Sequence, residues 1–270
     1  MEPVRVAIAG ASGRMGRTLI EAALHDGNIE LAAAFDRTGT PFIGRDVGEL
    51  TGTGSRRGII VGDDPAEAIA AADCLIEFTL PEATLKHVQQ ACAQKKAVVI
   101  GTTGFDENGK AAIKEAAQTI PIVFAPNMAV GVNTVFKLLE VAAKILSEDY
   151  DVEVIEAHHR FKVDAPSGTA LRMGEIVAKE RLQNLPMRAV FGREGITGER
   201  AAGTIGFSTI RGGDIVGDHT VMFAGLGERV EVTHKAGSRM PYASGALRAA
   251  RFLAGRDNGL YDMQDVLDLR

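Results

Sequence analysis

The amino-acid sequence predicts an α/β fold, with a mainly parallel sheet in the first part of the chain and a mixed sheet in the second. Short β-branched runs alternate with longer helical stretches as far as about residue 128. From residue 189 to 235 the chain is instead rich in valine, isoleucine and threonine interrupted by glycine. Alternating strands and helices imply right-handed crossovers and a parallel sheet, whereas closely spaced strands favour an antiparallel or mixed one.

The expected elements of the first part follow from these runs in order. A strand at 4–9 precedes a glycine-rich turn and a helix at 14–25, whose apolar side chains recur on one face. Further strands are expected at 31–35, 74–78, 97–100 and 122–125, with helices at 82–94 and 107–118. Residues 37–62 are rich in glycine, threonine and arginine without clear periodicity, and we expect mostly loop there.

The second part begins after Pro126 with a predicted helix at 132–146. A strand at 151–157 and a helix at 168–181 follow, then the strands of the mixed sheet within 189–235, and finally a helix at 238–253. We find no repeat, low-complexity tract or linker between these elements.

Composition narrows the class of protein. Of 270 residues, 46 % are apolar and 24 % charged, which are values of a globular chain. With 30 Lys and Arg against 35 Asp and Glu, the net charge of −5 argues against a nucleic-acid or membrane-surface protein. There is no basic, apolar leader and no apolar run of about 18 residues. Cys74 and Cys92 indicate neither a disulfide framework nor a zinc site, so we expect a soluble, cytoplasmic protein without a metal.

A glycine loop follows the first strand directly. Its pattern, G-x-x-G-x-x-G over residues 10–16, opens the next helix, where glycine lets the backbone approach a pyrophosphate and free N–H groups can hold it. Alone, such a turn can also bind nothing. Asp36 stands twenty residues after Gly16, where a dinucleotide-binding domain places an acid on the ribose, and Arg37 can face a 2′-phosphate. Together they predict a Rossmann-type domain that binds NADH or NADPH.

Two further turns follow predicted strands of the same sheet. Ligands bind at the carboxyl ends of the strands in open α/β sheets. The residues that we expect to contact the cofactor, including these turns, are Gly10, Ala11, Ser12, Gly13, Arg14, Met15, Asp36, Arg37, Gly101, Thr102, Thr103, Ala125, Pro126, Asn127 and Met128.

The most concentrated chemistry lies in residues 156–170, EAHHRFKVDAPSGTA. Adjacent histidines on a strand point to opposite faces, which argues against one metal ion held by both. Proton transfer by a histidine, with a lysine as cation and proton donor, is the better interpretation. The helix start at Ser167, Gly168 and Thr169 offers N–H groups and hydroxyls to a carboxylate. A basic surface loop capped by Ser167 remains the alternative from spacing alone.

These motifs together resemble one family. GASGRMG, GTTGF, EAHHRFKVDAPSGTA and RGGDIVGDH are similar to the motifs of the 4-hydroxy-tetrahydrodipicolinate reductase (dihydrodipicolinate reductase) family, over residues 4–269. The histidine-rich segment is the specific motif, whereas the glycine loop is shared widely. One departure is Ala129, where many relatives have serine, and this concerns a hydroxyl contact near the nicotinamide.

The resemblance implies a reaction and its residues. Water leaves the hydroxylated ring, and hydride then passes from NADH or NADPH to ring C4, giving tetrahydrodipicolinate on the diaminopimelate route to lysine. His158 is implied as the acid/base and Lys162 as the proton donor. The implied contacts of the two substrate carboxylates are His159, Lys162, Gly168 and Thr169, and Ser167 is expected to join them as the first residue of the helix start.

The resemblance also implies an organisation. Residues 1–128 and 240–270 form the dinucleotide-binding domain, and residues 129–239 form a substrate-binding domain that assembles a homotetramer. Two other function classes stay open from the residues. An aldehyde dehydrogenase needs an exposed nucleophilic cysteine, and a non-enzymatic NAD(P)-sensing module has no use for His158 and Lys162 before the PSGT turn.

Overall fold

The structure is a computed structural model that describes residues 2–52 and 55–270. It divides into two compact units, which we call unit 1 (described residues of Met1–Val130 and Arg239–Arg270) and unit 2 (Gly131–Ser238). In the described part of the chain, no helix is both long and apolar enough to span a bilayer.

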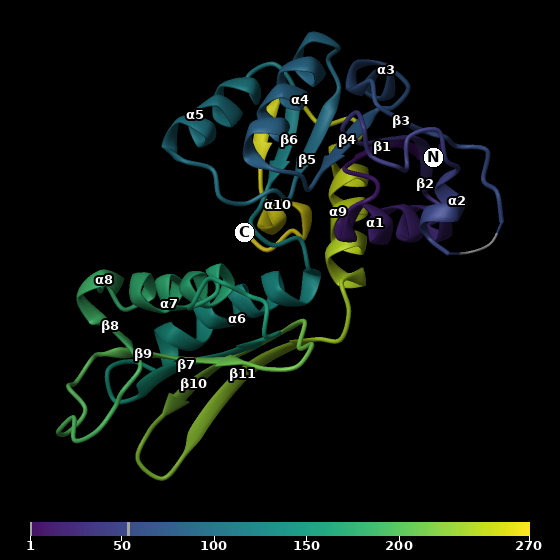
Figure 1. The fold of residues 1–270 in the computed structure, drawn as a ribbon. Coiled ribbons are helices and arrows are strands. Elements are labelled where there is room, and N and C mark those ends of the chain that lie inside the picture. Colours follow the sequence, from purple (N-terminus) through teal and green to yellow (C-terminus); the bar gives the residue numbers. More distant parts are fainter. Residues whose placement is uncertain (1, 53–54) are drawn as a thin grey trace. The chain divides into compact units, whose positions relative to one another are not determined.

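Unit 1 is built on a seven-stranded parallel sheet, in the order β12-β6-β5-β4-β1-β2-β3 (Figure 1). Its strands are β1 (Val4–Ala9), β2 (Ile29–Phe35), β3 (Val61–Gly62), β4 (Cys74–Glu77), β5 (Ala97–Ile100), β6 (Pro121–Phe124) and β12 (Gly259–Tyr261). Its helices are α1 (Arg14–His25), α2 (Val47–Leu50), α3 (Pro65–Ala70), α4 (Pro81–Ala93), α5 (Glu107–Ala116), α9 (Met240–Leu253) and α10 (Met263–Val266).

Central strands of this sheet, such as β1 and β5, are apolar on both faces because helices cover both. On one face, Val6 and Ile8 of β1 share a buried cluster with residues of α1 and α9, among them Leu19 and Leu247. On the other face, Ala7 lies in a cluster with residues of α3, α4 and α5. Strands buried on both faces read as continuous apolar runs, which is why the sequence indicated them well.

Some elements of unit 1 differ from the sequence expectation. The segment 37–62, predicted as mostly loop, contains the short helix α2 and strand β3. The carboxylate of Asp46 orders this segment by accepting hydrogen bonds from the N–H groups of Gly48, Arg57 and Gly58. Helix α3 and strand β12 were not expected, because pieces of 6 and 3 residues are too short for a periodic signal.

Unit 2 is a five-stranded mixed sheet with helices. The strand order is β11-β10-β7-β9-β8, in which β7, β8 and β9 are parallel and β10 is antiparallel to β7 and β11. Its elements are α6 (Val130–Ile145), β7 (Asp151–His158), α7 (Gly168–Glu180), α8 (Leu185–Arg188), β8 (Ala189–Phe191), β9 (Ile205–Arg211), β10 (Gly217–Ala224) and β11 (Arg229–Ala236). A parallel sheet with crossover helices and a second, mixed sheet confirm the predicted fold class.

Candidate active site

The predicted cofactor residues of unit 1 follow strands whose carboxyl ends lie in a row. Since β6, β5, β4, β1 and β2 are consecutive neighbours in the parallel sheet, the segments after them share one edge. The strand order changes direction between β1 and β4, and such a switch point is where open α/β sheets bind ligands.

The glycine loop has the geometry that its sequence predicts. Gly10 has a φ of +65°, which side-chain-bearing residues rarely adopt. Gly16 lies in α1 so close to the loop that a Cβ there would stand 2.1 Å from the carbonyl oxygen of Gly10. The turn is therefore tight, and α1 starts directly above it.

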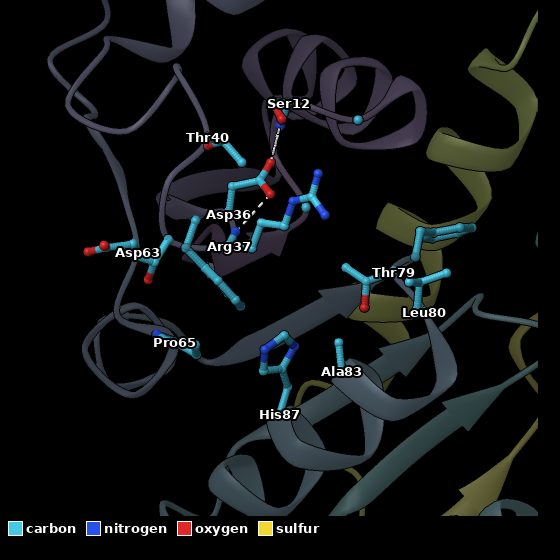
Figure 2. Close-up of a pocket in the computed structure, with 15 residues that line it drawn as sticks. Ser12, Asp36, Arg37, Thr40, Asp63, Pro65, Thr79, Leu80, Ala83 and His87 are labelled. Atoms are coloured by element: carbon cyan, nitrogen blue, oxygen red, sulfur yellow. Dashed lines mark hydrogen bonds between the residues drawn. The ribbon is translucent and has the colours of Figure 1, made fainter.

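Asp36 is fixed against this loop (Figure 2). Its Oδ2 accepts hydrogen bonds from the N–H of Ser12 at 2.8 Å and from the Ser12 hydroxyl at 2.6 Å, while Oδ1 accepts the N–H of Arg37 at 2.8 Å. The acid at the end of β2 and the loop after β1, which are 24 positions apart, thus form one rigid corner.

A cavity of about 690 Å³ opens at this corner, within the usual size range of a small-molecule site. Five of its lining residues were predicted: Gly10, Ser12, Gly13, Asp36 and Arg37. The residues that sequence reasoning missed are Phe35, Thr38, Thr40, Asp63, Pro65, Phe78, Thr79, Leu80, Ala83 and His87. Most of these follow β2, β3 or β4. They are recognised as cavity residues from the order of the strands in the sheet, because no local motif marks them.

The remaining predicted cofactor residues do not line this cavity: Ala11, Arg14, Met15, Gly101, Thr102, Thr103, Ala125, Pro126, Asn127 and Met128. Two of them have side chains engaged elsewhere. The Thr102 hydroxyl is buried 2.9 Å from that of Thr84, and the side-chain oxygen of Asn127 accepts the N–H of Ala129.

A buried carboxylate stands behind the cavity. Oε1 of Glu77, at the end of β4, lies 2.8 Å from Nδ1 of His87 on α4, and the His87 ring points into the cavity (Figure 2). The other carboxylate oxygen of Glu77, Oε2, accepts hydrogen bonds from the hydroxyls of Thr79 and Thr84. Nothing in the local sequence singles out this Glu–His pair.

In unit 2, strand register assembles the second group of predicted residues. His158 is the last residue of β7 and pairs with Arg211 of β9, while Glu156 pairs with His219 of β10. The rings of His158 and His219 meet edge to face at a centroid distance of 5.0 Å.

Glu156 is the centre of this group and is only 1 % exposed. Oε2 lies 2.6 Å from Nδ1 of His158, and the Arg211 guanidinium donates to both carboxylate oxygens, each at 2.8 Å. Oε1 also accepts the N–H of Ser167 at 3.0 Å. Burial raises the pKa of Glu156, but the hydrogen bonds from Arg211, His158 and Ser167 outweigh it and hold the pKa at about 2.

Both histidines of the group are held in the neutral form near pH 7. Burial lowers the pKa of His158, and the charges of Lys162 and Arg211 act in the same direction against the opposing effect of Glu156. Burial, with the neighbouring His158, lowers the pKa of His219 to about 4. Neutral imidazoles can accept a proton or a hydrogen bond on one ring nitrogen.

The remaining predicted residues lie in the turn after β7. Nζ of Lys162 donates to Oδ1 of Asp164 at 2.8 Å, and Nδ1 of His159 is shielded with no hydrogen-bond partner in the described part of the chain. Ser167 caps α7 by accepting the N–H of Ala170, and its hydroxyl lies 2.9 Å from Nε2 of His219. The space beside Gly168 is open.

Sequence reasoning missed Glu156, Arg211 and His219. Glu156 had a weak signal, because it lies two positions before His158 and side chains two apart on a strand share a face. Arg211 and His219 begin and end the RGGDIVGDH motif, but they lie 55 and 52 positions from their partners, and the motif by itself assigned them no role. Within residues 2–52 and 55–270, no group of three or more His, Cys, Asp or Glu side chains is arranged to hold a metal ion.

Family models match almost the whole chain. The model described as dihydrodipicolinate reductase, N-terminus, matches residues 4–128, and the model described as dihydrodipicolinate reductase, C-terminus, matches residues 131–267. The chain belongs to the dihydrodipicolinate reductase family. The predicted resemblance is thereby confirmed.

Curated proteins with high identity support the same family. A 4-hydroxy-tetrahydrodipicolinate reductase of Aromatoleum aromaticum is 72 % identical over 100 % of this chain and 97 % of its own length. One of Dechloromonas aromatica is 61 % identical, with 100 % of both chains covered. Both relatives are named as reductases, which are oxidoreductases, and this chain is an oxidoreductase of the same family.

Solved structures agree with the fold. A dipicolinate-bound dihydrodipicolinate reductase from Paenisporosarcina sp. TG-14 has a TM-score of 0.76 and 25 % identity, covering 97 % of this chain and 98 % of that one. An amine dehydrogenase from Mycobacterium smegmatis has a TM-score of 0.61 at 11 % identity, covering 97 % of this chain and 95 % of that one. At this identity the likeness shows a shared fold alone.

Proposed function

We propose that the chain reduces 4-hydroxy-tetrahydrodipicolinate to tetrahydrodipicolinate with NADH or NADPH, on the diaminopimelate route to lysine. Family membership over nearly the full length supports this function, as do the names of the curated relatives. The observation that carries it is the grouping of His158, Lys162 and the start of α7 at one end of β7.

Unit 1 binds the dinucleotide in this proposal. The tight loop at Gly10 lets backbone N–H groups approach a pyrophosphate, and Asp36 is already oriented to accept hydrogen bonds from ribose hydroxyls. Arg37 offers a planar cation to a 2′-phosphate, so both NADH and NADPH fit. When bound, the nicotinamide supplies the hydride that ring C4 receives after water has left.

The reacting proton is handled in unit 2. His158 acts as the acid/base through Nε2, because Nδ1 is occupied by Glu156. Lys162 is the proton donor, and its positive charge stabilises electron density that develops on the ring. The Lys162 contact with Asp164 is partly exposed, so a substrate carboxylate can compete for the ammonium group.

A ring with two carboxylates needs two anion sites. His159 and Lys162 form one, and the helix start at Gly168 and Thr169 forms the other. The hydroxyl of Ser167 is committed to capping α7 and to His219, so Ser167 contributes by shaping that helix start. The solved relative that carries dipicolinate, a flat dicarboxylate, supports this substrate class.

The organisation follows the same proposal. Residues 1–128 with 240–270 serve as the dinucleotide-binding domain, and residues 129–239 bind substrate and form a homotetramer in the cytoplasm. Ala129 leaves no hydroxyl at the position where many relatives have serine, and its N–H is held by Asn127.

The two cysteines do not favour an aldehyde dehydrogenase, and the residues around His158 do not favour an NAD(P)-sensing module. Cys74 is buried in β4, where burial raises the pKa of its thiol, and Cys92 lies against the carbonyl oxygen of Ala116. These are poor nucleophiles for an aldehyde dehydrogenase. An NAD(P)-sensing module has no need of the His158–Glu156 pair.

The direct test follows the absorbance of the reduced nicotinamide after substrate is generated in place by the preceding synthase. We expect oxidation of NADH and NADPH only when substrate is present, and no reaction with aldehydes. Pyridine-2,6-dicarboxylate should inhibit competitively against substrate. If pyridine-2-carboxylate inhibits equally well, the proposal of a second anion site at the start of α7 is wrong.

A further inference from the structure

A buried ion pair behind His158 lies outside the residues so far given a role in catalysis. Both terminal nitrogens of Arg211 donate hydrogen bonds to the carboxylate of Glu156, and one of them also donates to the carbonyl oxygen of Asp164. Glu156 is held from three further directions by Ser167, Thr209 and His158. Such a carboxylate cannot rotate, because each of its oxygens has partners in fixed positions.

The arrangement determines which nitrogen of His158 carries the proton. An ionised carboxylate only accepts hydrogen bonds, and the bidentate contact with Arg211 keeps Glu156 ionised. The 2.6 Å contact from Oε2 to Nδ1 therefore requires a hydrogen on Nδ1. In a neutral ring, the lone pair is then on Nε2.

We propose that Glu156, locked by Arg211, is a positioning residue that presents His158 as the neutral Nδ1–H tautomer, with Nε2 as proton acceptor. This deepens, and rests on, the proposed reductase function. It specifies which ring nitrogen of His158 is free to accept a proton, while Lys162 keeps the donor role proposed above.

A glycine keeps Nε2 accessible. Gly217, at the start of β10, faces His158 so closely that an added Cβ would stand 3.1 Å from Nε2. Its φ is not in the left-handed region, so alanine is compatible with the backbone there and changes only the space beside the ring. By contrast, a Cβ on nearby Gly212 would meet open space.

Charged and titratable groups face His158 from each neighbouring element. Glu156 comes from β7, Arg211 from β9 and His219 from β10, while Lys162 comes from the turn, where its ammonium group also contacts Asp164. Arg211 and Lys162 both disfavour a second proton on the ring, so the neutral state does not depend on a single neighbour.

The first experiment measures the tautomer by ¹⁵N NMR of histidine-labelled protein, with His158→Gln used to assign its ring signals. We expect protonated Nδ1 and unprotonated Nε2 in the wild type. In Glu156→Gln, the amide can donate to Nδ1, and we expect the proton on Nε2. A wild-type ring protonated on Nε2 overturns the proposal, and this measurement requires no catalytic turnover.

Kinetics of the same variant test the consequence. Glu156→Gln should lower kcat about 100-fold, the lower end of what general acid–base catalysis contributes, with KM for substrate and cofactor within about twofold. An unchanged kcat with a switched tautomer contradicts the positioning role. Absence of activity in the wild type instead contradicts the proposed function and leaves the tautomer result standing.

The pH dependence of kcat/KM distinguishes a positioning role of Arg211 from a purely structural one. Arg211→Gln removes a cation that lowers the His158 pKa, so the acidic limb of kcat/KM should move to higher pH. Arg211→Lys keeps the charge and should restore the limb toward its wild-type position. If Arg211→Gln reduces activity without moving the limb, the residue is only structural.

Gly217→Ala provides a test that leaves the ion pair intact. It should lower kcat at least tenfold while the Nδ1–H tautomer persists, because only the approach to Nε2 is obstructed. Gly212→Ala is the matched control and should leave kcat unchanged. Equal kcat in both variants shows that Nε2 is not the reacting nitrogen.

Discussion

Each unit of the molecule contains a buried glutamate whose carboxylate lies against Nδ1 of a histidine. In unit 1 the pair is Glu77 and His87 at 2.8 Å, and in unit 2 it is Glu156 and His158 at 2.6 Å. The two glutamates are 0 % and 1 % exposed. The contacts are nearly equal, yet the surroundings of the two carboxylates differ.

The difference is the source of positive charge. The other contacts of Glu77 are hydroxyls, and among the described residues its ion pairs include His87 alone. Glu156 has the guanidinium of Arg211 as well. Among the described residues, the printed side-chain contacts of Glu77 include no lysine or arginine, whereas in unit 2 Arg211 balances the carboxylate of Glu156 and leaves His158 available for proton transfer.

Catalysis should show the largest contrast between the pairs. We expect His158→Gln to lower kcat by about 10²–10⁴, the usual contribution of general acid–base catalysis, with a smaller change in substrate KM. His87→Gln should alter kcat by less than about threefold and act mainly on cofactor KM, because His87 lines the unit 1 cavity. Steady-state kinetics of both variants decides this, and a kcat loss of similar size in both contradicts the contrast.

Stability should show the reverse order. His87→Leu leaves Oε1 of the buried Glu77 carboxyl without the hydrogen-bond contact it has at 2.8 Å and should destabilise unit 1 by about 3 kcal/mol, the upper range for an unsatisfied buried polar group. His158→Leu leaves Glu156 bound to Arg211 and should cost roughly 1 kcal/mol, as for one lost hydrogen bond. Thermal unfolding compares the two.

A second substitution sharpens this comparison. Adding Glu77→Gln to His87→Leu replaces the carboxyl that lost its partner by an amide, which can still accept the hydroxyls of Thr79 and Thr84, and should recover most of the loss. If the double variant is less stable than His87→Leu alone, the unpartnered carboxyl of Glu77 is not the reason for the effect.

The histidines of unit 2 should make stability depend on pH. The pKa of His219 is lowered to about 4 and that of His158 is also lowered, whereas an unfolded histidine titrates near 6.5. The unfolded chain thus binds more protons between these values. Stability is complete above about pH 6.5 and declines as the pH falls toward 4, by about 1.4 kcal/mol per pH unit for each proton.

The measurement is Tm from pH 8 to pH 4.5. His219→Gln can retain a hydrogen bond to Ser167 and should flatten the decline, because one of the titrating groups is gone. An equally steep decline in His219→Gln would falsify the assignment to that ring.

The smallest expected effect concerns cofactor choice in unit 1. Arg37→Ala should raise KM for NADPH about tenfold, through loss of a cation beside the 2′-phosphate, and KM for NADH by less than about twofold. In the wild type, the ratio of kcat/KM for the two cofactors should stay below about a thousandfold, or 4 kcal/mol. A larger preference shows that the role of Asp36 or Arg37 is misassigned.

The sequence by itself determined the fold class and the segments that carry chemistry. Strands such as β1, covered by helices on both faces, read as continuous apolar runs. The glycine loop and the run from His158 to Thr169 are local patterns, because their residues must be close along the chain to form a turn or a helix start. Asp36 is recognised by its fixed offset from the loop, across one helix and one strand.

Only the tertiary structure decided what surrounds those segments. Parallel register places Arg211 opposite His158, and antiparallel register places His219 opposite Glu156. In unit 1, sheet order brings Thr79 and His87 to the cavity beside Asp36. Strand pairing joins residues more than fifty positions apart without any local periodicity, so the charge that fixes the state of His158 is visible only in the folded chain.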